Sequence, residues 1–157
     1  MTTYVAGPGR KEFSSDSFQI VAPKFAGQIQ TQLKRRGTDD VLANVTISWN
    51  RFANLVFVCI PRISFNLLAN DTLYMPLLDL KVLSLSQATN QLAGSISFLP
   101  TGVAPAANGY VFAVGGSGVP AQDNSLYFFP DETSVNNFVA NSPIVFGVTN
   151  IRFIVKQ

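Results

Sequence analysis

The chain has 157 residues, of which 47% are hydrophobic and only 13% are charged, and its formal net charge is +2. This length predicts one domain that buries its core without disulfides or metal. Histidine is absent and Cys59 is the only cysteine, which removes the usual general base, the Ser-His-Asp arrangement, most zinc sites and any intrachain disulfide. We therefore expect a protein that is not an enzyme and uses no cofactor, metal or small-molecule substrate, with Cys59 as a small buried apolar residue.

Basic side chains gather near the amino end. Residues 1–36 carry six basic side chains against two acidic ones, whereas the remainder carries five against seven. This mild polarity makes five residues candidates for contact with nucleic acid or with an inner layer of a particle: Arg10, Lys11, Lys34, Arg35 and Arg36. The first residues, "MTTYVAGPGRKEFSSDSF", contain no apolar core of signal-peptide length, so we expect a protein that is not secreted by that route.

The apolar pattern of residues 18–37 predicts a short strand followed by a short helix. "FQIVA" (18–22) is the strand candidate. In "KFAGQIQTQLKRRG" (24–37), Phe25, Ile29 and Leu33 recur every four residues, cations close the segment and Gly37 stops it. At the end of such a helix the cations of residues 34–36 complement the helix dipole, which is the alternative to a contact with nucleic acid.

From residue 41 the apolar period changes to two, which predicts strands. In "VLANVTISW", Val45 and Ile47 share one face with the other apolar residues, while Asn44, Thr46 and Ser48 share the opposite face. "LVFVCIPRISF" (55–65) is apolar on both faces, as a central strand is. Pro61 cannot donate to a sheet ladder, so we expect a bulge or bend there.

Further strands are expected along the rest of the chain. "LYMPLLDLKVLSLSQ" (73–87) reads as one strand with a bulge, "QLAGSISFL" (91–99), "GYVFAV" (109–114) and "SLYFF" (125–129) follow, and residues 143–157 form a last strand that slips phase near Asn150. Residues 131–141 hold either one helical turn or an irregular loop. About eight strands without βαβ alternation predict an all-β, antiparallel, jelly-roll-like sandwich of two sheets over 41–157, after a mildly basic segment with a short helix over 1–40.

A glycine pattern after one of these strands resembles a nucleotide fingerprint. Gly116, Gly118 and Ala121 satisfy G-x-G-x-x-[G/A] behind "YVFAV". A helix would have to follow to hold the phosphate, but "DNSLYFFP" comes next, and the acidic residue expected about 20 positions further on is missing. We interpret the glycines as part of a loop between strands.

The segment from Val82 to Gln122 contains no charged side chain, although it is rich in Ser, Gly, Asn, Gln and Pro. Charged residues are depleted in the cores of protein interfaces. The pattern therefore favours packing against a neighbouring protein, with a bland loop-rich surface as the alternative.

These features together resemble the small single-jelly-roll capsid and vertex proteins of icosahedral viruses and phages. The resemblance is carried by the strand series from Val41 to Phe129, the closing "IVFGVTNIRFIVKQ", and the amino-terminal "GRKEF" and "LKRRG". It implies a virion structural protein that assembles with itself and with other virion proteins and is made in the host cytoplasm. The cations are scattered rather than gathered in an arginine-rich arm, which favours a vertex or minor shell role, or a capsid over an internal layer or membrane.

Two other classes of function remain open. A carbohydrate- or receptor-binding β-module, such as a spike or fibre head, would stack sugars on aromatic side chains, for which the candidates are Trp49, Tyr74, Tyr110 and Tyr127. Four scattered aromatic residues are, however, more often core or rim residues. An enzyme would have to work through carboxylates or lysine. Asp39-Asp40 and Asp131-Glu132 are adjacent in sequence, which is typical of turns and caps rather than of an acid-base couple.

Overall fold

Strands make up nearly all of the regular structure in the computed structural model, which describes residues 25–83, 90–116, 118–131 and 137–156. The elements are β1 (Ala26–Arg35), β2 (Val41–Phe52), β3 (Leu55–Ile60), β4 (Ile63–Phe65), β5 (Leu73–Pro76), β6 (Asn90–Leu99), β7 (Ala107–Val114), a single 3-10 turn η1 (Pro120–Gln122), β8 (Ser125–Phe129), β9 (Ile144–Phe146) and β10 (Thr149–Ile154). No helix in this part of the chain is long and apolar enough to cross a membrane. The predicted strand at 18–22 lies outside the described residues.

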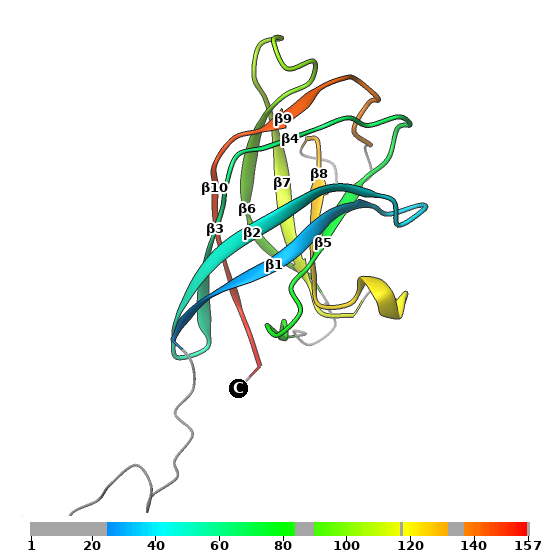
Figure 1. The fold of residues 1–157 in the computed structure, drawn as a ribbon. Coiled ribbons are helices and arrows are strands. Elements are labelled where there is room, and N and C mark those ends of the chain that lie inside the picture. The colour runs from blue at the N-terminus through cyan, green and yellow to red at the C-terminus, as the bar shows by residue number, and fades with distance from the viewer. Residues whose placement is uncertain (1–24, 84–89, 117, 132–136, 157) are drawn as a thin grey trace, which may run out of the picture.

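The strands form one curled antiparallel sheet in the order β10-β3-β2-β1-β5-β8-β7-β6-β9-β4 (Figure 1). Two short breaks allow this arrangement. Pro61 and Arg62 separate β3 from β4, and Gly147 and Val148 separate β9 from β10. β3 and β4 belong to one segment of the chain, and β9 and β10 belong to another. Because β10 pairs with β3 and β9 pairs with β4, each of these segments contributes one strand to each end of the sheet.

The structure confirms the all-β antiparallel class, and it corrects the finer architecture. One curled sheet of ten strands stands in the place of the two sheets and about eight strands that we predicted. The predicted bend at Pro61 is confirmed, because the strand stops there and resumes at Ile63. The predicted phase slip in the last strand is found at Gly147–Val148 rather than near Asn150, where β10 runs without a break.

The inside of the curl is filled by apolar side chains, and phenylalanine rings occupy its upper part. Phe146 lies at the centre of this group, with its ring centroid 5.0 Å from that of Phe65, 5.4 Å from Phe138 and 5.6 Å from Phe128. Phe98 completes the group through an edge-on contact with Phe138 at 5.1 Å. Most of the described phenylalanine side chains are thus part of the core.

The helix predicted at 24–37 is wrong, because these residues form β1. Ile29, Thr31 and Leu33 are buried, while Gln28 and Gln30 between them are exposed, which is the period-two pattern of a strand. A spacing of four residues is a multiple of two as well as close to one helical turn, so Ile29 and Leu33 fitted both periods. Pairing with β2 from Ala26 to Lys34 decides between them.

Two further strand predictions need correction. The strand predicted at 73–87 ends after four residues at Pro76, because Leu78 adopts a positive φ of 56° and turns the chain, and residues 84–89 lie outside the described part. The segment 55–65 was expected to be buried on both faces, yet Phe57 and Cys59 are exposed between buried neighbours. Cys59 is therefore not the buried apolar residue that its sequence context predicted.

Candidate functional site

β1 has a sheet partner along its whole length on one side only. β2 pairs with it from Ala26 to Lys34, whereas β5 pairs with it only at Lys34 and Arg35. Pro76 lacks an N–H group and ends β5, and the turn at Leu78 then leads the chain away. The side of β1 from Ala26 to Leu33 that faces away from β2 is therefore an open edge among the described residues, and we call it the open edge.

The alternation of an antiparallel ladder identifies which backbone groups lie on this open edge. The carbonyl oxygen of Phe25 accepts a hydrogen bond from the N–H of Arg51 at 2.7 Å. Odd-numbered residues of β1 before its bulge at Leu33/Lys34 therefore bond to β2, and even-numbered residues direct their N–H and C=O groups to the other side. Gln28, Gln30 and Gln32 thus present their backbone groups along the open edge.

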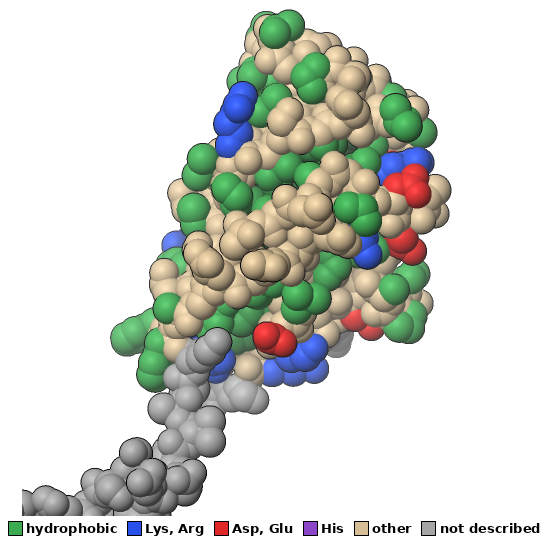
Figure 2. Space-filling view, in the orientation of Figure 1, with side chains coloured by type: hydrophobic (Ala, Val, Ile, Leu, Met, Phe, Trp, Pro, Cys, Tyr) green, Lys and Arg blue, Asp and Glu red, His purple; other side chains and the backbone are tan. Residues whose placement is uncertain are grey.

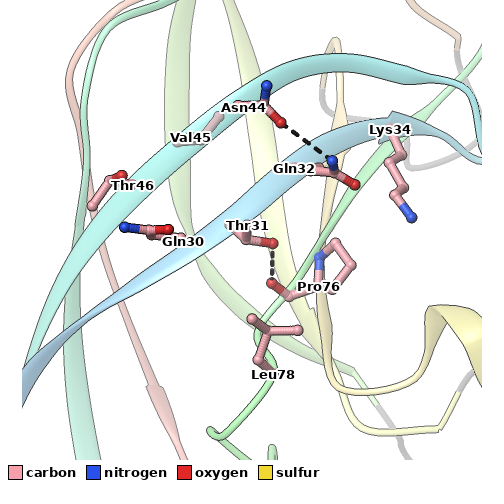
Figure 3. A pocket seen from close by; sticks show the side chains of 9 residues that line it. All are labelled: Gln30, Thr31, Gln32, Lys34, Asn44, Val45, Thr46, Pro76 and Leu78. Carbon is pink, nitrogen blue, oxygen red and sulfur yellow. Dashed lines mark hydrogen bonds between the residues drawn. The ribbon is translucent and has the colours of Figure 1, made fainter.

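A groove of about 450 Å³ lies beside the carboxyl-terminal half of this edge (Figure 3). Gln30, Gln32 and Lys34 line it from β1, and Pro76 and Leu78 line it from the end of β5. The Thr31 hydroxyl donates to the carbonyl oxygen of Pro76 at 2.6 Å and ties the two strands together. The Gln32 side-chain amide donates to Asn44 Oδ1 at 3.2 Å across the strand pair. The groove is therefore lined mainly by neutral hydrogen-bonding groups, with Lys34 as its one cation.

The outward side chains of β1 and β2 continue this polar character. Gln28 lies opposite Ser48, Gln30 opposite Thr46 and Gln32 opposite Asn44. With Asn50 they form what we call the polar face: Gln28, Gln30, Gln32, Asn44, Thr46, Ser48 and Asn50, all exposed or half-buried and none charged. Figure 2 shows this side of the molecule, where uncharged polar groups and backbone, with apolar side chains among them, cover the centre and most charged side chains lie toward the edges.

An exposed aromatic ring adjoins the polar face. Phe57 of β3 lies opposite Asn50 of β2, and Arg152 of β10 lies opposite Phe57 on its other side. The Phe57 residue is 40% exposed and borders a hollow of about 200 Å³ that Asn50 and Asn150 also line. An aromatic surface beside amide side chains is thus available on the outside of the sheet.

The aromatic candidates taken from the sequence are elsewhere. Trp49, Tyr74 and Tyr127 are buried and Tyr110 is half-buried, which agrees with their interpretation as core or rim residues and leaves the three buried rings unavailable for stacking on a sugar. Phe57 was missed because the whole run 55–60 is apolar. Its signal was the alternation of β-branched Val56, Val58 and Ile60, which places Phe57 on the opposite face.

The predicted cationic residues do not act as a group at a helix end, since β1 is a strand. Lys34 lies at the groove. Arg35 forms ion pairs with Asp40 at 3.2 Å and with Asp71 at 3.5 Å. The Arg36 guanidinium lies 4.4 Å from the ring centroid of Tyr127 and donates to Thr72 Oγ1 at 3.4 Å. Arg10 and Lys11 lie outside the described residues, and contact of this set with nucleic acid stays a prediction.

Asp39, in the turn between β1 and β2, is the most perturbed carboxyl group among the described residues. The Tyr74 hydroxyl donates to its Oδ1 at 2.7 Å and Gln122 Nε2 donates to the same atom at 3.1 Å. The hydrogen bond from Tyr74, followed by that from Gln122, lowers the pKa of Asp39. Burial and the hydrogen bond to Asp39 raise the pKa of Tyr74. The prediction that Asp39 and Asp40 are turn residues is confirmed.

The glycines of the nucleotide-like pattern lie between β7 and β8, as the loop interpretation predicted. Gly118 has a φ of 81°, with open space where a Cβ would stand. Only the single turn η1 follows it. Within the described residues, no cluster of three or more His, Cys, Asp or Glu side chains is placed to hold a metal ion.

No family model and no curated protein matches the chain. Among solved structures, it is similar to a reovirus attachment protein, sigma1, whose crystal structure was determined in complex with alpha-2,3-sialyllactose. The likeness covers 86% of this chain and 67% of that chain, with a TM-score of 0.54 and 11% sequence identity. At this identity the likeness shows a β-rich fold alone, and no family match confirms the resemblance to jelly-roll capsid proteins that we named from the sequence.

Proposed function

We propose that this chain is a viral β-module that binds a glycan receptor through its polar face, as a spike or fibre head does. The observation that carries the proposal is the polar face itself: seven neutral hydrogen-bonding side chains on two adjacent strands, with the exposed ring of Phe57 beside them. The fold likeness to a reovirus attachment protein, crystallised with a sialylated sugar, supports the same class of function.

The chemistry of this surface fits a sugar. Each sugar hydroxyl both donates and accepts hydrogen bonds, and so do the amide and hydroxyl side chains of Gln30, Thr46 and Asn50. Sugars also have an apolar C–H face, which can cover an aromatic ring, and Phe57 offers one beside Asn50. Because none of the seven side chains is charged, binding a neutral sugar there would not require the desolvation of an ion.

A shell subunit of a virion is the second candidate function. Large apolar side chains outside the polar face also stand in solvent, with Leu68 87% exposed and Val103 91% exposed. Val103 belongs to the charge-free segment 82–122, and exposed apolar side chains in surroundings poor in charge favour contact with other proteins. The two functions are compatible, since an attachment module is itself mounted on a virion.

The test measures the binding of lactose and of 3′-sialyllactose to the purified full chain by ligand-observed NMR and by isothermal titration calorimetry. We expect binding that Asn50→Ala and Phe57→Ala each weaken about tenfold, which corresponds to about 1.4 kcal/mol. Asn108→Ala is the matched control, because Asn108 is an exposed amide on β7, outside the polar face. It is expected to bind as the unchanged chain does.

The two sugars separate what the site recognises. Equal binding of both places the contact on the neutral part of the ligand, as the uncharged polar face predicts. A sugar that binds but is indifferent to Asn50→Ala and Phe57→Ala binds elsewhere and overturns the site. Absence of binding across a broad glycan array would count against the proposed function and leave the shell subunit as the better candidate.

A further inference from the structure

The open edge of β1 carries backbone groups that side-chain recognition of a sugar does not use. Gln28 and Gln30 each present one N–H and one C=O to this edge, and these groups have no backbone partner among the described residues, whereas Gln32 lies beside Pro76 of β5. A strand edge of this kind is a template for pairing with another extended chain.

Proteins usually protect such edges, and the protective features of β1 stand at one end only. Charged side chains, prolines and bulges block the addition of a strand. The bulge of β1 falls at Leu33/Lys34, its first charge is Lys34, and Pro76 lies against the same end. From Ala26 to Leu33 the strand has no bulge, no proline and no charge. The unprotected stretch is the same stretch that lacks a partner.

We propose that the open edge pairs with the open edge of a second copy of this chain, antiparallel and about a twofold axis, so that one sheet runs through both copies. In the register that pairs the free groups, Gln28 of one copy lies opposite Gln30 of the other, and Gln30 lies opposite Gln28. Both are even-numbered residues whose N–H and C=O groups point to the open edge. Antiparallel strands exchange both bonds at such pairs.

The side chains of β1 match in the same register. Residues opposite each other in a sheet lie on the same face. Ile29 then meets Ile29 of the second copy on the buried face, and glutamine meets glutamine on the outer face. A slip by one residue would place Ile29 against a glutamine and lose this match. The strand is thus complementary to itself in backbone, in apolar pattern and in its lack of charge, which is what a twofold interface between identical copies requires.

The association is tested by sedimentation equilibrium of the full chain over a concentration series, with no sugar present. We expect a monomer–dimer equilibrium that Gln30→Pro weakens at least tenfold. Proline removes the N–H of residue 30, which points to the open edge, and leaves the ladder to β2 intact because odd-numbered residues form it. Gln30→Ala, which keeps the N–H, is the matched control and is expected to dimerise nearly as the unchanged chain does. Circular dichroism and thermal melting of each variant verify folding.

Disulfide trapping tests the register directly. In a Cys59→Ser background, a chain with Gln28→Cys is mixed with a chain with Gln30→Cys under mild oxidation. The Cα atoms of a hydrogen-bonded antiparallel pair lie about 5.5 Å apart, within the range of a disulfide. We expect the mixture to cross-link faster than either chain alone.

Three results would overturn the proposal. These are a monomer at the highest soluble concentration, a dimer that folded Gln30→Pro leaves unchanged, and cross-linking with no preference for the 28–30 pair. If the chain does not associate with itself but binds an added extended peptide of foreign sequence, the open edge belongs to a different partner. None of these results depends on glycan binding, so the pairing and the proposed function can fail separately.

Discussion

Asp39 shows, at the scale of single residues, how far a turn is held by distant parts of the chain. Its carboxylate is exposed, yet it accepts hydrogen bonds from Tyr74 of β5 and from Gln122 of η1. Gln122 Nε2 also donates to the backbone carbonyl of Arg36 at 2.8 Å. Asp39 itself has a φ of 62°, a conformation that aspartate tolerates better than most residues. The turn is thus fixed by side chains from two other segments.

These hydrogen bonds predict a pH dependence of stability. The folded-state pKa of Asp39 is depressed below its ordinary value of 3.8, mainly by Tyr74. A depressed carboxyl pKa contributes stability that is present above the ordinary value and is lost as the pH falls below it. Replacing Tyr74 by Phe removes the main donor, so we expect this variant to be less stable than the unchanged chain at pH 7. The difference in the free energy of unfolding between the two proteins is expected to be smaller at pH 3. Urea unfolding at both values measures it.

Tyr110→Phe is the control for this experiment. Tyr110 is a half-buried residue of β7, and the hydroxyl that donates to Asp39 is that of Tyr74. Its replacement is expected to change stability by the same amount at both pH values. If the difference in the free energy of unfolding between Tyr74→Phe and the unchanged chain is the same at pH 7 and pH 3, the Tyr74 hydroxyl does not stabilise the carboxylate of Asp39.

At the scale of elements, β7 approaches β8 more closely at Gly109 than a side chain permits. A Cβ added there would collide with the backbone carbonyl of Phe129 and would lie 3.1 Å from Ile96. We expect Gly109→Ala to destabilise the fold by about 2–3 kcal/mol, since neither a carbonyl in a ladder nor a packed strand can yield cheaply. Chemical unfolding of the purified variant measures the loss.

Gly118→Ala provides the comparison for Gly109. No atom stands near its missing Cβ, so only its φ of 81° resists a side chain. That strain is worth about 1–2 kcal/mol, and we expect the smaller loss of the two. A larger loss for Gly118→Ala than for Gly109→Ala would show that the packing of β7 on β8 is looser than described.

The sequence predicted most strands correctly and misplaced the one that matters most for the site. Residues 41–48 alternate so clearly that the outward Asn44, Thr46 and Ser48 could be named from the sequence alone. β1 could not be recognised, because Ile29 and Leu33 fit a helix as well as a strand and only the pairing with β2 decides. Three of the seven residues of the polar face therefore fell within a predicted helix. The open edge depends on where β5 ends, and the prediction of one strand over 73–87 passed over Pro76, which marks that end.

For the whole molecule, charge is sparse and much of it is internally paired. The net charge is +2, and Arg35 and Arg36 are bound to partners within the fold. Three independent phosphate contacts by residues 34–36 would lower the salt slope of nucleic-acid binding by about three units when they are neutralised. The arrangement of the side chains leads us to expect less, with Lys34→Ala changing the slope by about one unit and carrying most of the effect.

Titration of a nonspecific oligonucleotide between low and physiological salt measures these slopes. The single variant Lys34→Ala is compared with the triple variant at residues 34–36, and Lys81→Ala serves as a control cation from outside the groove. A slope change near three for the triple variant and near one for Lys34→Ala would show that the arginines leave their partners to bind phosphate. Absence of binding at low salt would remove nucleic acid from the partners of this part of the chain.

The closure of the sheet also affects how fast the chain folds. Cys59 of β3 meets Asn150 of β10, and Ser64 of β4 meets Val145 of β9, so the last contacts join positions separated by more than half of the chain. During synthesis, β1, β2 and β3 can pair in turn, whereas the second side of β3 and the strand β4 must wait until β9 and β10 have been synthesised. Loop closure over such distances slows folding. Until that moment the nascent chain exposes, besides the open edge of β1, the sides of β3 and β6 that the finished molecule covers, and the interval between synthesis and closure is when it is most exposed to wrong partners.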